Sequence, residues 1–173
     1  MSALPTSSFT MFAKFKPYEY TNSSYNCDSA PVIAFGRREL GSIGIVISTY
    51  NGRVGYRWGV DQASPDSGGI HFDPDYNEND HDIDYATIFN NDVAVAVTYD
   101  GTKFRMYVKG KQVRCNSSWD HECKLPKINN TIYVFSDDRK HDYNDSGFSG
   151  KIYEIALWNR VLTADELTAI TYR

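Results

Sequence analysis

The strongest constraint on the fold lies in residues 91–113, where large hydrophobic residues recur at every second position in two successive runs. The runs Val93–Val97 and Phe104–Val108 flank Asp100-Gly101, a dipeptide that supplies the positive φ angles of a two-residue hairpin turn. A second tight turn is predicted at Lys109-Gly110-Lys111. Since side chains alternate between the two faces of a strand, the pattern predicts an antiparallel meander with one buried face. Such a meander needs further strands to be stable in water.

Further short strands, separated by turn residues, are predicted along the chain. In the second run, Phe104, Met106 and Val108 share the face predicted to be buried. Trp158 ends the last predicted strand and is expected in the core. The complete set of predicted strands is Phe9–Lys16, Pro31–Gly36, Ile43–Tyr50, Arg53–Gly59, Tyr85–Phe89, Val93–Tyr99, Lys103–Lys109, Thr131–Ser136 and Gly150–Trp158. This succession is typical of an all-β, two-sheet sandwich or jelly roll.

One short helix is predicted near the end of the chain. Thr163-Ala-Asp-Glu166 has the pattern of a capping box, in which the threonine hydroxyl and the glutamate carboxylate each accept from a backbone N–H of the first turn. Leu162 and Leu167 stand where a hydrophobic staple would place them. Because so short a helix is marginal alone, it is expected to dock on the sandwich in a structural role.

Two long segments resemble a known fold family. The segment VAVTYDGTKFRMYVKGKQV, followed later by FSGKIYEIALWNRVLTADEL, is similar to the signature segments of concanavalin A-like domains of the laminin-G/pentraxin type. The opening strand FTMFAKFKP is similar to the family's early strand. The resemblance implies a single jelly-roll domain over residues 1–173. Because family members usually have another strand before this one, it also implies that the domain is part of a larger chain. The family binds many ligands, so function must come from the site.

Composition excludes several classes of protein. Hydrophobic residues make up 41% and aromatic residues 14% of the chain, as in a folded β protein. The net charge of −4 argues against a nucleic-acid partner, which usually requires a basic surface. No hydrophobic run approaches the roughly twenty residues of a membrane span, so membrane insertion is not expected.

Cysteines and glycosylation motifs favour an extracellular location or a cell or virion surface. Cys115 and Cys123 bracket a short polar loop and are predicted to form a loop-closing disulfide, which leaves Cys27 over. The alternative is a reduced protein with three ordinary thiols. Asn-x-Ser/Thr motifs, which predict N-glycosylation, occur at Asn22, Asn116, Asn129 and Asn144.

An acidic loop offers a candidate calcium site. Asp73, Asp75 and Asn77 alternate as oxygen donors, and Asp82 and Asp84 follow closely. Calcium takes six to eight hard oxygen ligands, which such a loop can supply. Many members of the resembled family also bind calcium near their ligand site. The alternative is a solvated acidic loop without a metal.

Loop aromatics are candidate carbohydrate-binding residues, because sugars stack a C–H face on a flat ring and bond their hydroxyls to planar polar groups. Trp119 is the strongest candidate, since a polar loop offers it little to bury against, and Asp120 and His121 adjoin it. Tyr76 and Tyr143 are further candidates within acidic loops. The alternative for each is a partly exposed aromatic without a ligand.

The strands themselves offer another carbohydrate-binding surface. Arg53 and Arg57 alternate on one predicted strand, and Arg105 and Tyr107 alternate on another. If these strands share an open face, they form a basic, aromatic-lined groove whose guanidinium groups suit the carboxylate or sulfate of an acidic glycan. The alternative is a solvated sheet face on which nearby acids neutralise the arginines.

Catalytic patterns are missing from the sequence. The E-x-D-x-x-E pattern of glucanases with this fold does not occur, and no zinc-binding spacing accompanies the histidines, all of which fall in predicted loops: His71, His81, His121 and His141. We therefore predict a non-catalytic, lectin-like module that binds cell-surface glycans or glycoproteins for attachment. The alternative is a protein-binding or scaffold domain of an extracellular or viral surface protein.

Overall fold

The structure is a computed structural model that describes residues 7–18, 30–35, 42–47, 54–59, 68–72, 88–113, 132–134 and 149–173. These residues form ten strands and one helix. In chain order they are β1 (Phe9–Pro17), β2 (Ala30–Phe35), β3 (Ser42–Ile47), β4 (Val54–Gly59), β5 (Gly68–Phe72), β6 (Val93–Tyr99), β7 (Phe104–Val108), β8 (Lys111–Val113), β9 (Ile132–Val134), β10 (Gly150–Trp158) and α1 (Ala164–Thr171).

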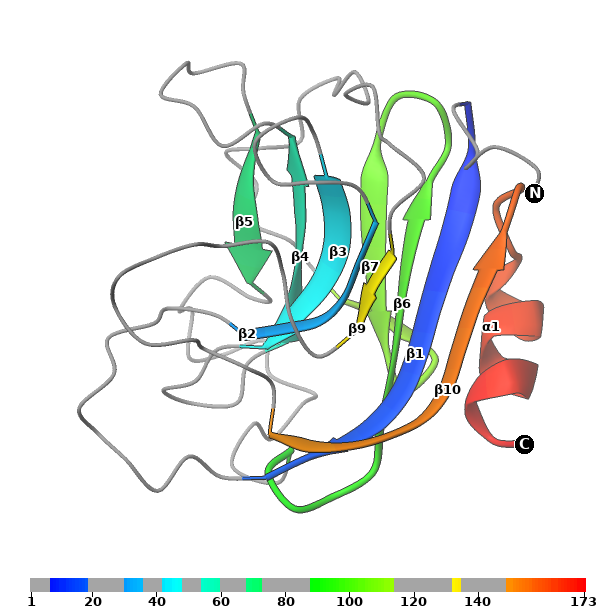
Figure 1. Cartoon of the computed structure of the whole chain (residues 1–173). Helices are drawn as coiled ribbons and strands as arrows, with labels where there is room; N and C mark the ends of the chain where they lie inside the picture. The colour runs from blue at the N-terminus through cyan, green and yellow to red at the C-terminus, as the bar shows by residue number, and fades with distance from the viewer. Residues whose placement is uncertain are drawn as a thin grey trace, which may run out of the picture.

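The strands make two five-stranded sheets that face each other (Figure 1). The first sheet has the order β10-β1-β6-β7-β8, the second has the order β5-β4-β3-β2-β9, and all neighbouring strands are antiparallel. The predicted all-β, two-sheet sandwich is confirmed. Strands that follow each other in sequence pair in both sheets, but β10 returns from the end of the chain to lie beside β1.

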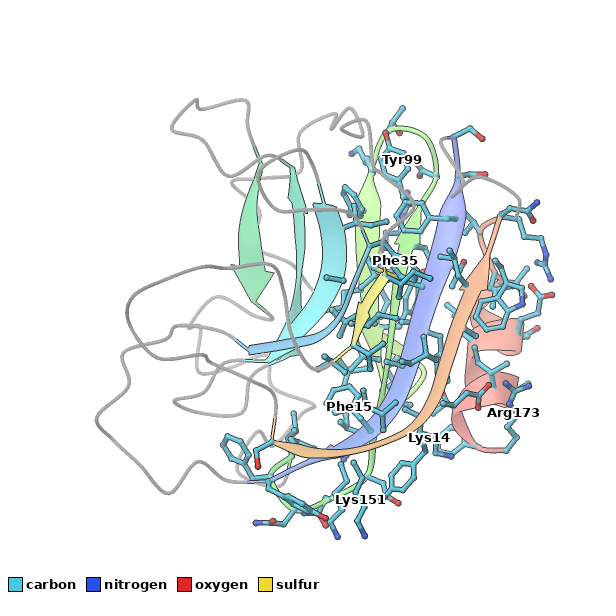
Figure 2. All side chains as sticks on the ribbon, in the orientation of Figure 1. Lys14, Phe15, Phe35, Tyr99, Lys151 and Arg173 are labelled. Atoms are coloured by element: carbon cyan, nitrogen blue, oxygen red, sulfur yellow. The ribbon has the colours of Figure 1, made fainter. Side chains whose placement is uncertain are left out.

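The core between the sheets is built from the alternating positions of both sheets. Phe15, Phe35 and Tyr99 are among the buried side chains that fill this space (Figure 2). In β2 a bulge between Pro31 and Ile33 interrupts the alternation of side chains between the two faces, so Val32 and Ile33 both contribute to the core. The remaining buried members of this cluster are Phe9, Met11, Ala13, Ile43, Ile45, Ile88, Val93, Val95, Val97, Met106 and Val108.

The meander is present, but its first turn is longer than predicted. Tyr99 pairs with Phe104, so the connection has four residues, and the prediction of a two-residue turn at Asp100-Gly101 is wrong. One Asp100 carboxylate oxygen accepts from the N–H groups of Thr102 and Lys103 (3.0 and 2.8 Å) and from the Thr102 hydroxyl (2.8 Å). The carboxylate thereby satisfies the backbone of the longer turn.

The second turn is the tight one. Val108 pairs with Lys111, and the two central residues, Lys109 and Gly110, have φ angles of 50° and 78°. Two consecutive positive φ angles are typical of a type I′ hairpin, in which glycine is favoured because it carries no Cβ. The predicted turn at Lys109-Gly110-Lys111 is therefore confirmed.

Helix α1 packs on the outer face of the first sheet (Figure 1). Leu162 and Leu167 are buried there against Phe12, Ala94 and Ala96. The sheet side chains of this second cluster alternate with those that face the other sheet, so the first sheet is buried on both faces. Trp158, Tyr107, Ala156 and Ile170 are partly buried around the same cluster.

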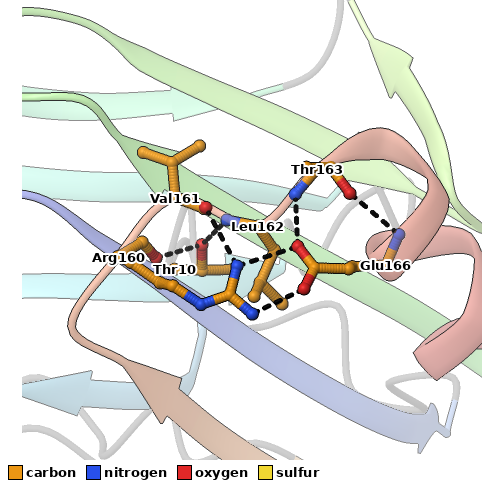
Figure 3. Close-up of polar contacts among 6 residues, drawn as sticks. All are labelled: Thr10, Arg160, Val161, Leu162, Thr163 and Glu166. Carbon is orange, nitrogen blue, oxygen red and sulfur yellow. Dashed lines mark hydrogen bonds and ion pairs between the residues drawn. The ribbon is translucent and has the colours of Figure 1, made fainter.

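The start of α1 has the predicted capping box (Figure 3). The N–H of Glu166 donates to the Thr163 hydroxyl (3.3 Å), and the N–H of Thr163 donates to the Glu166 carboxylate (2.9 Å). The Arg160 guanidinium also donates to this carboxylate. The Thr10 hydroxyl of β1 donates to the Arg160 carbonyl (2.9 Å) and accepts from the Leu162 N–H (2.9 Å). These bonds fix the approach of the helix to the sheet.

Two predicted core positions differ from expectation. Met106 and Val108 are fully buried, but Phe104 is only partly buried at the edge of the core. Trp158 is half-buried on the outer side of the first sheet, where its ring meets that of Phe12 edge-on at 6.5 Å. The strand setting of Trp158 was predicted correctly, but the pattern could not tell which face of the sheet it would occupy.

The remaining differences concern strand limits. Residues 88–90, at the end of the predicted strand Tyr85–Phe89, form a turn in which Ile88 is buried and Asn90 has a φ of 62°. Strand β5 was missed, because its sequence GGIHF lies in a stretch interpreted as a long loop. His71 is therefore a strand residue, and its prediction as a loop residue is wrong.

Candidate functional site

The outer face of the first sheet is already occupied. Tyr107 packs against the cluster beneath α1, and Arg105 pairs with the Asp100 carboxylate of the neighbouring turn. The pKa of Asp100 lies well below its usual range, mainly because Arg105 donates a hydrogen bond to the carboxylate. The N–H groups of Lys103 and Thr102 lower this pKa further. Tyr107 and Arg105 therefore both have structural partners, and neither is available as the predicted groove requires.

The predicted groove that joins the arginines of two strands is wrong. Arg57 lies on β4 of the second sheet, whereas Arg105 and Tyr107 lie on β7 of the first sheet. The period of two indicates which residues of one strand share a face, but it does not indicate which strands share a sheet. Among the residues that the structure describes, Arg57 is the one member of the proposed groove that remains a candidate site residue.

Backbone register places the Arg57 position on the outer face of the second sheet. Its neighbours along β4, Tyr56 and Trp58, pair with Ile45 and Ile43, the core residues of β3. Because successive positions of a strand alternate between the two faces of a sheet, Arg57 lies on the face that points away from the core. Its cross-strand partners are Gly44 of β3 and Ile70 of β5.

Glycines occupy four positions near Arg57 on this face, alongside Ile70, its direct partner on β5, and Phe72, the partner of Gly55. Gly55 and Gly59 are the same-face positions before and after it on β4, Gly44 lies opposite it on β3, and Gly68 of β5 pairs with Gly59. Without side chains at these positions, the backbone forms a floor beside the arginine. Positions without side chains allow a ligand to approach the backbone closely wherever they are exposed.

The structure explains why one of these glycines is required. A Cβ on Gly44 would lie 2.6 Å from the Ile33 carbonyl oxygen and 3.3 Å from the Ala34 Cβ. Gly44 and its partner on β2, Ala34, are both buried, so this part of the face is not exposed to a ligand. The second sheet thus brings its strands into close contact at the centre of the candidate site.

Sequence reasoning selected Arg57 but missed its glycine surroundings. The signal is present in β4, where VGYRWG has glycine two residues before and two residues after the arginine. Gly44 and Gly68 carry no such signal, because their proximity to Arg57 depends on strand pairing. We define the glycine-bordered site as Arg57 with Gly44, Gly55, Gly59 and Gly68.

The other predicted site residues lie outside the described residues and stay predictions. They are the carbohydrate-binding candidates Arg53, Tyr76, Trp119, Asp120, His121 and Tyr143, the calcium ligands Asp73, Asp75, Asn77, Asp82 and Asp84, the cysteines Cys27, Cys115 and Cys123, and the glycosylation sites Asn22, Asn116, Asn129 and Asn144. Within the described ranges, no three His, Cys, Asp or Glu side chains gather as metal ligands would. The same ranges hold no helix with the length and hydrophobicity needed to cross a membrane.

Comparison with known families supports the architecture. Residues 2–168 match the family model of the concanavalin A-like lectin/glucanases superfamily, which is nearly the whole chain. No curated protein sequence matches the chain significantly.

Solved structures of two sialidases and of a neurotoxin binding domain have the same fold. The CBM40 module of the Ruminococcus gnavus IT-sialidase bound to α2,3-sialyllactose is similar, with a TM-score of 0.66 and 15% identity over 96% of this chain and 84% of that chain. The leech intramolecular trans-sialidase complexed with 2,7-anhydro-Neu5Ac has a TM-score of 0.65 and 14% identity over 96% of this chain and 23% of its own. The botulinum neurotoxin serotype G binding domain has a TM-score of 0.64 and 16% identity over 96% and 36% of the two chains. At these identities, the similarity concerns the fold.

Proposed function

Because the chain belongs to the concanavalin A-like lectin/glucanases superfamily, we propose that it is a non-catalytic module that binds glycans ending in sialic acid. The observation that carries the proposal is the position of Arg57 among glycines on the outer face of the second sheet. The Ruminococcus gnavus module, which this chain matches over most of both lengths, is bound to a sialylated trisaccharide. That similarity supports the choice of an acidic sugar over a neutral one.

The chemistry of the site fits a carboxylate. Sialic acid is a pyranose that carries a carboxylate, and a guanidinium can donate two parallel hydrogen bonds to that group. Each hydrogen bond to a charged group contributes about 1.5–3 kcal/mol when water is excluded. The glycine floor leaves room for the ring beside the arginine, because no side chain rises from Gly55 or Gly59.

The loops complete the proposed module. Trp119, with Asp120 and His121, supplies an aromatic platform for a further sugar, and Tyr76, Tyr143 and Arg53 add contacts. Calcium bound by the acidic loop around Asp75 stabilises the site. We propose an extracellular or surface location within a larger chain, with the Cys115–Cys123 disulfide and N-linked glycans as further features. Attachment to cell-surface glycoproteins is the use that follows.

The decisive experiment titrates 3′-sialyllactose and lactose into the wild type and into Arg57→Ala, with binding measured by isothermal calorimetry. We expect the wild type to prefer the sialylated sugar and Arg57→Ala to lose roughly 10- to 100-fold in affinity, which corresponds to the loss of about one charge-assisted hydrogen bond. Arg57→Lys keeps the charge but not the planar fork, so its affinity should lie between those of Arg57→Ala and the wild type.

Arg105→Ala is the matched control, since it removes an arginine that is already paired with Asp100 on the other sheet. It should bind 3′-sialyllactose as the wild type does. Equal affinity of the wild type for lactose and 3′-sialyllactose would contradict an acidic-sugar site. If neither sugar binds, the protein-binding or scaffold alternative replaces this proposal.

A further inference from the structure

Basic side chains gather at one end of the first sheet, remote in the sheet from the Asp100–Lys103 turn. Lys14 and Lys16 lie in the second half of β1, and Lys151 is the second residue of β10. Lys109 lies in the turn between β7 and β8, and Lys111 begins β8. Arg173 follows α1, which ends at the same place: Lys14, Lys151 and Arg173 are close to this end in Figure 2. We call these six residues the basic end.

Strand register creates an unfavourable contact within this group. Lys16 and Lys151 are direct partners in the antiparallel pair of β1 and β10. Like charges directly opposite each other on neighbouring strands destabilise a sheet. Within the described part of the chain, no acidic side chain pairs with Lys16, Lys109 or Lys151.

The acidic side chains described at this end have other partners. Asp92 accepts from the Tyr153 hydroxyl at 2.9 Å, and Glu154 pairs with Arg173. Lys14 is also engaged, because its ammonium donates to the carbonyl oxygens of Thr171 and Arg173 (3.4 and 2.9 Å) at the end of α1. Among the described residues, the basic end therefore has a positive excess, although the net charge of the chain is −4.

The turn of β7 and β8 is held against α1, which fixes the remaining lysines in the same region. The Tyr172 hydroxyl donates to the Lys109 carbonyl oxygen at 3.1 Å, and a Cβ on Gly110 would lie 3.4 Å from the Thr168 Cα. Lys151, Lys16 and Lys109 belong to the first, second and fourth strands of the sheet order. Three strand spacings cover about 14 Å, which is more than one small anion can bridge.

We propose that the basic end is a second binding surface, which takes a linear sulfated polysaccharide. Such a chain presents anionic groups at intervals along its length, so it can meet lysines on several strands at once and neutralise the Lys16–Lys151 pair. An anionic membrane is less suited, because the exposed aromatics at this end, Tyr153 and Tyr172, use their hydroxyls within the protein. This surface is separate from the glycine-bordered site, which lies on the other sheet.

The test measures binding of the wild type to dextran sulfate and to uncharged dextran. Dextran sulfate should bind, should raise the melting temperature because it binds the native state, and should lose affinity as salt screens the charges. Dextran should neither bind nor change the melting temperature. Binding to phosphatidylserine vesicles without binding to dextran sulfate would overturn the proposal in favour of a membrane surface.

Lys151→Glu is the informative variant, because it replaces the repulsion between positions 16 and 151 with an attraction between opposite charges and so should keep the fold. Its affinity for dextran sulfate should fall roughly tenfold or more, since a positive charge at the surface is replaced by a negative one. Lys103→Glu, which makes the same charge change beside the Asp100 turn, is the matched control and should change affinity by less than about twofold. Equal losses in both variants would show a response to net charge alone and would overturn the proposal.

Cross-titration separates the two sites. Lys151→Glu should bind 3′-sialyllactose normally, and Arg57→Ala should bind dextran sulfate normally. If Arg57→Ala also loses dextran sulfate, the polyanion uses the glycine-bordered site and the basic end has no separate role.

Discussion

The outer faces of the two sheets are built from different kinds of residue. On the first sheet, Phe12, Trp158 and Leu167 pack between the strands and α1, so that this face is a second hydrophobic layer. On the second sheet, the positions around Arg57 are glycines, and Gly44 lies so close to β2 that it cannot carry a Cβ. The first of these faces is filled by large side chains, whereas the second combines the glycines with the positions of Ile70 and Phe72.

This difference separates arginines with structural partners from Arg57, the arginine of the proposed site. Arg105 and Arg160, near the first sheet, pair with Asp100 and Glu166, which belong to a turn and to a helix cap. Arg57 has Gly55, Gly59 and Gly44 as same-face neighbours, together with Ile70 of β5. Arg105 and Arg160 thus serve the turn and the helix cap that they pair with, whereas the role of Arg57 is the one proposed above.

The largest expected effect is on the covered face. Phe12→Ala removes a completely buried ring from beneath α1 and should lower the free energy of unfolding by about 3–5 kcal/mol, measured by urea denaturation. Tyr153→Ala, which removes a half-exposed ring from β10, is the matched control and should cost less than about 1 kcal/mol. Similar losses for both would mean that α1 adds little to the stability of the first sheet.

On the second sheet, a single methyl group should be disruptive. Gly44→Ala places a Cβ 2.6 Å from the Ile33 carbonyl oxygen, so β2 and β3 must move apart. We expect a loss of about 1–3 kcal/mol in the free energy of unfolding, the usual cost of overpacking. The urea midpoint measures it, and an unchanged midpoint would mean that the strands are not held this closely.

Sequence patterns predicted the first sheet well because its strands carry their information locally. The limits of β6 and β10 agree with the predicted strands, and the capping box at Thr163 and Glu166 is present. Each of these features depends on residues within one turn or one strand of each other. In these elements the local sequence preference and the packing of the folded protein favour the same secondary structure.

The features that were missed depend on distant partners. The length of the first turn is set by the bonds of the Asp100 carboxylate, which the Asp-Gly dipeptide does not specify. The short strand β5 contains Gly68 and Gly69 and is formed by pairing with β4, not by strand propensity. The assumed groove between Arg57 and Arg105 failed because strand pairing decides the sheet, and periodicity does not.

A smaller effect is expected from the cap of α1, which tests how firmly the helix covers the first sheet. Thr163→Ala removes the hydroxyl that accepts from the Glu166 N–H and should lower the free energy of unfolding by about 1 kcal/mol. Thr163→Ser keeps the acceptor, so its thermal and urea midpoints should match those of the wild type. A loss of the same size in Thr163→Ser would assign the effect to the methyl group and not to the cap.

The smallest effect concerns the pH dependence of the same cap. The Arg160 guanidinium, followed by the Thr163 N–H, lowers the pKa of Glu166 from 4.5 to about 2. Because the folded state favours the ionised form, its contribution to stability is complete above about pH 5 and is lost as the pH falls through 4.5 toward 2. Urea midpoints measured from about pH 6 down to about pH 2.5 should fall less steeply for Glu166→Gln than for the wild type. Arg160→Ala removes the main cause of the shift and should flatten the profile in the same way. If both variants keep the wild-type slope, the ionised cap does not stabilise α1, and the cover of the first sheet depends on Phe12 and Leu167 alone.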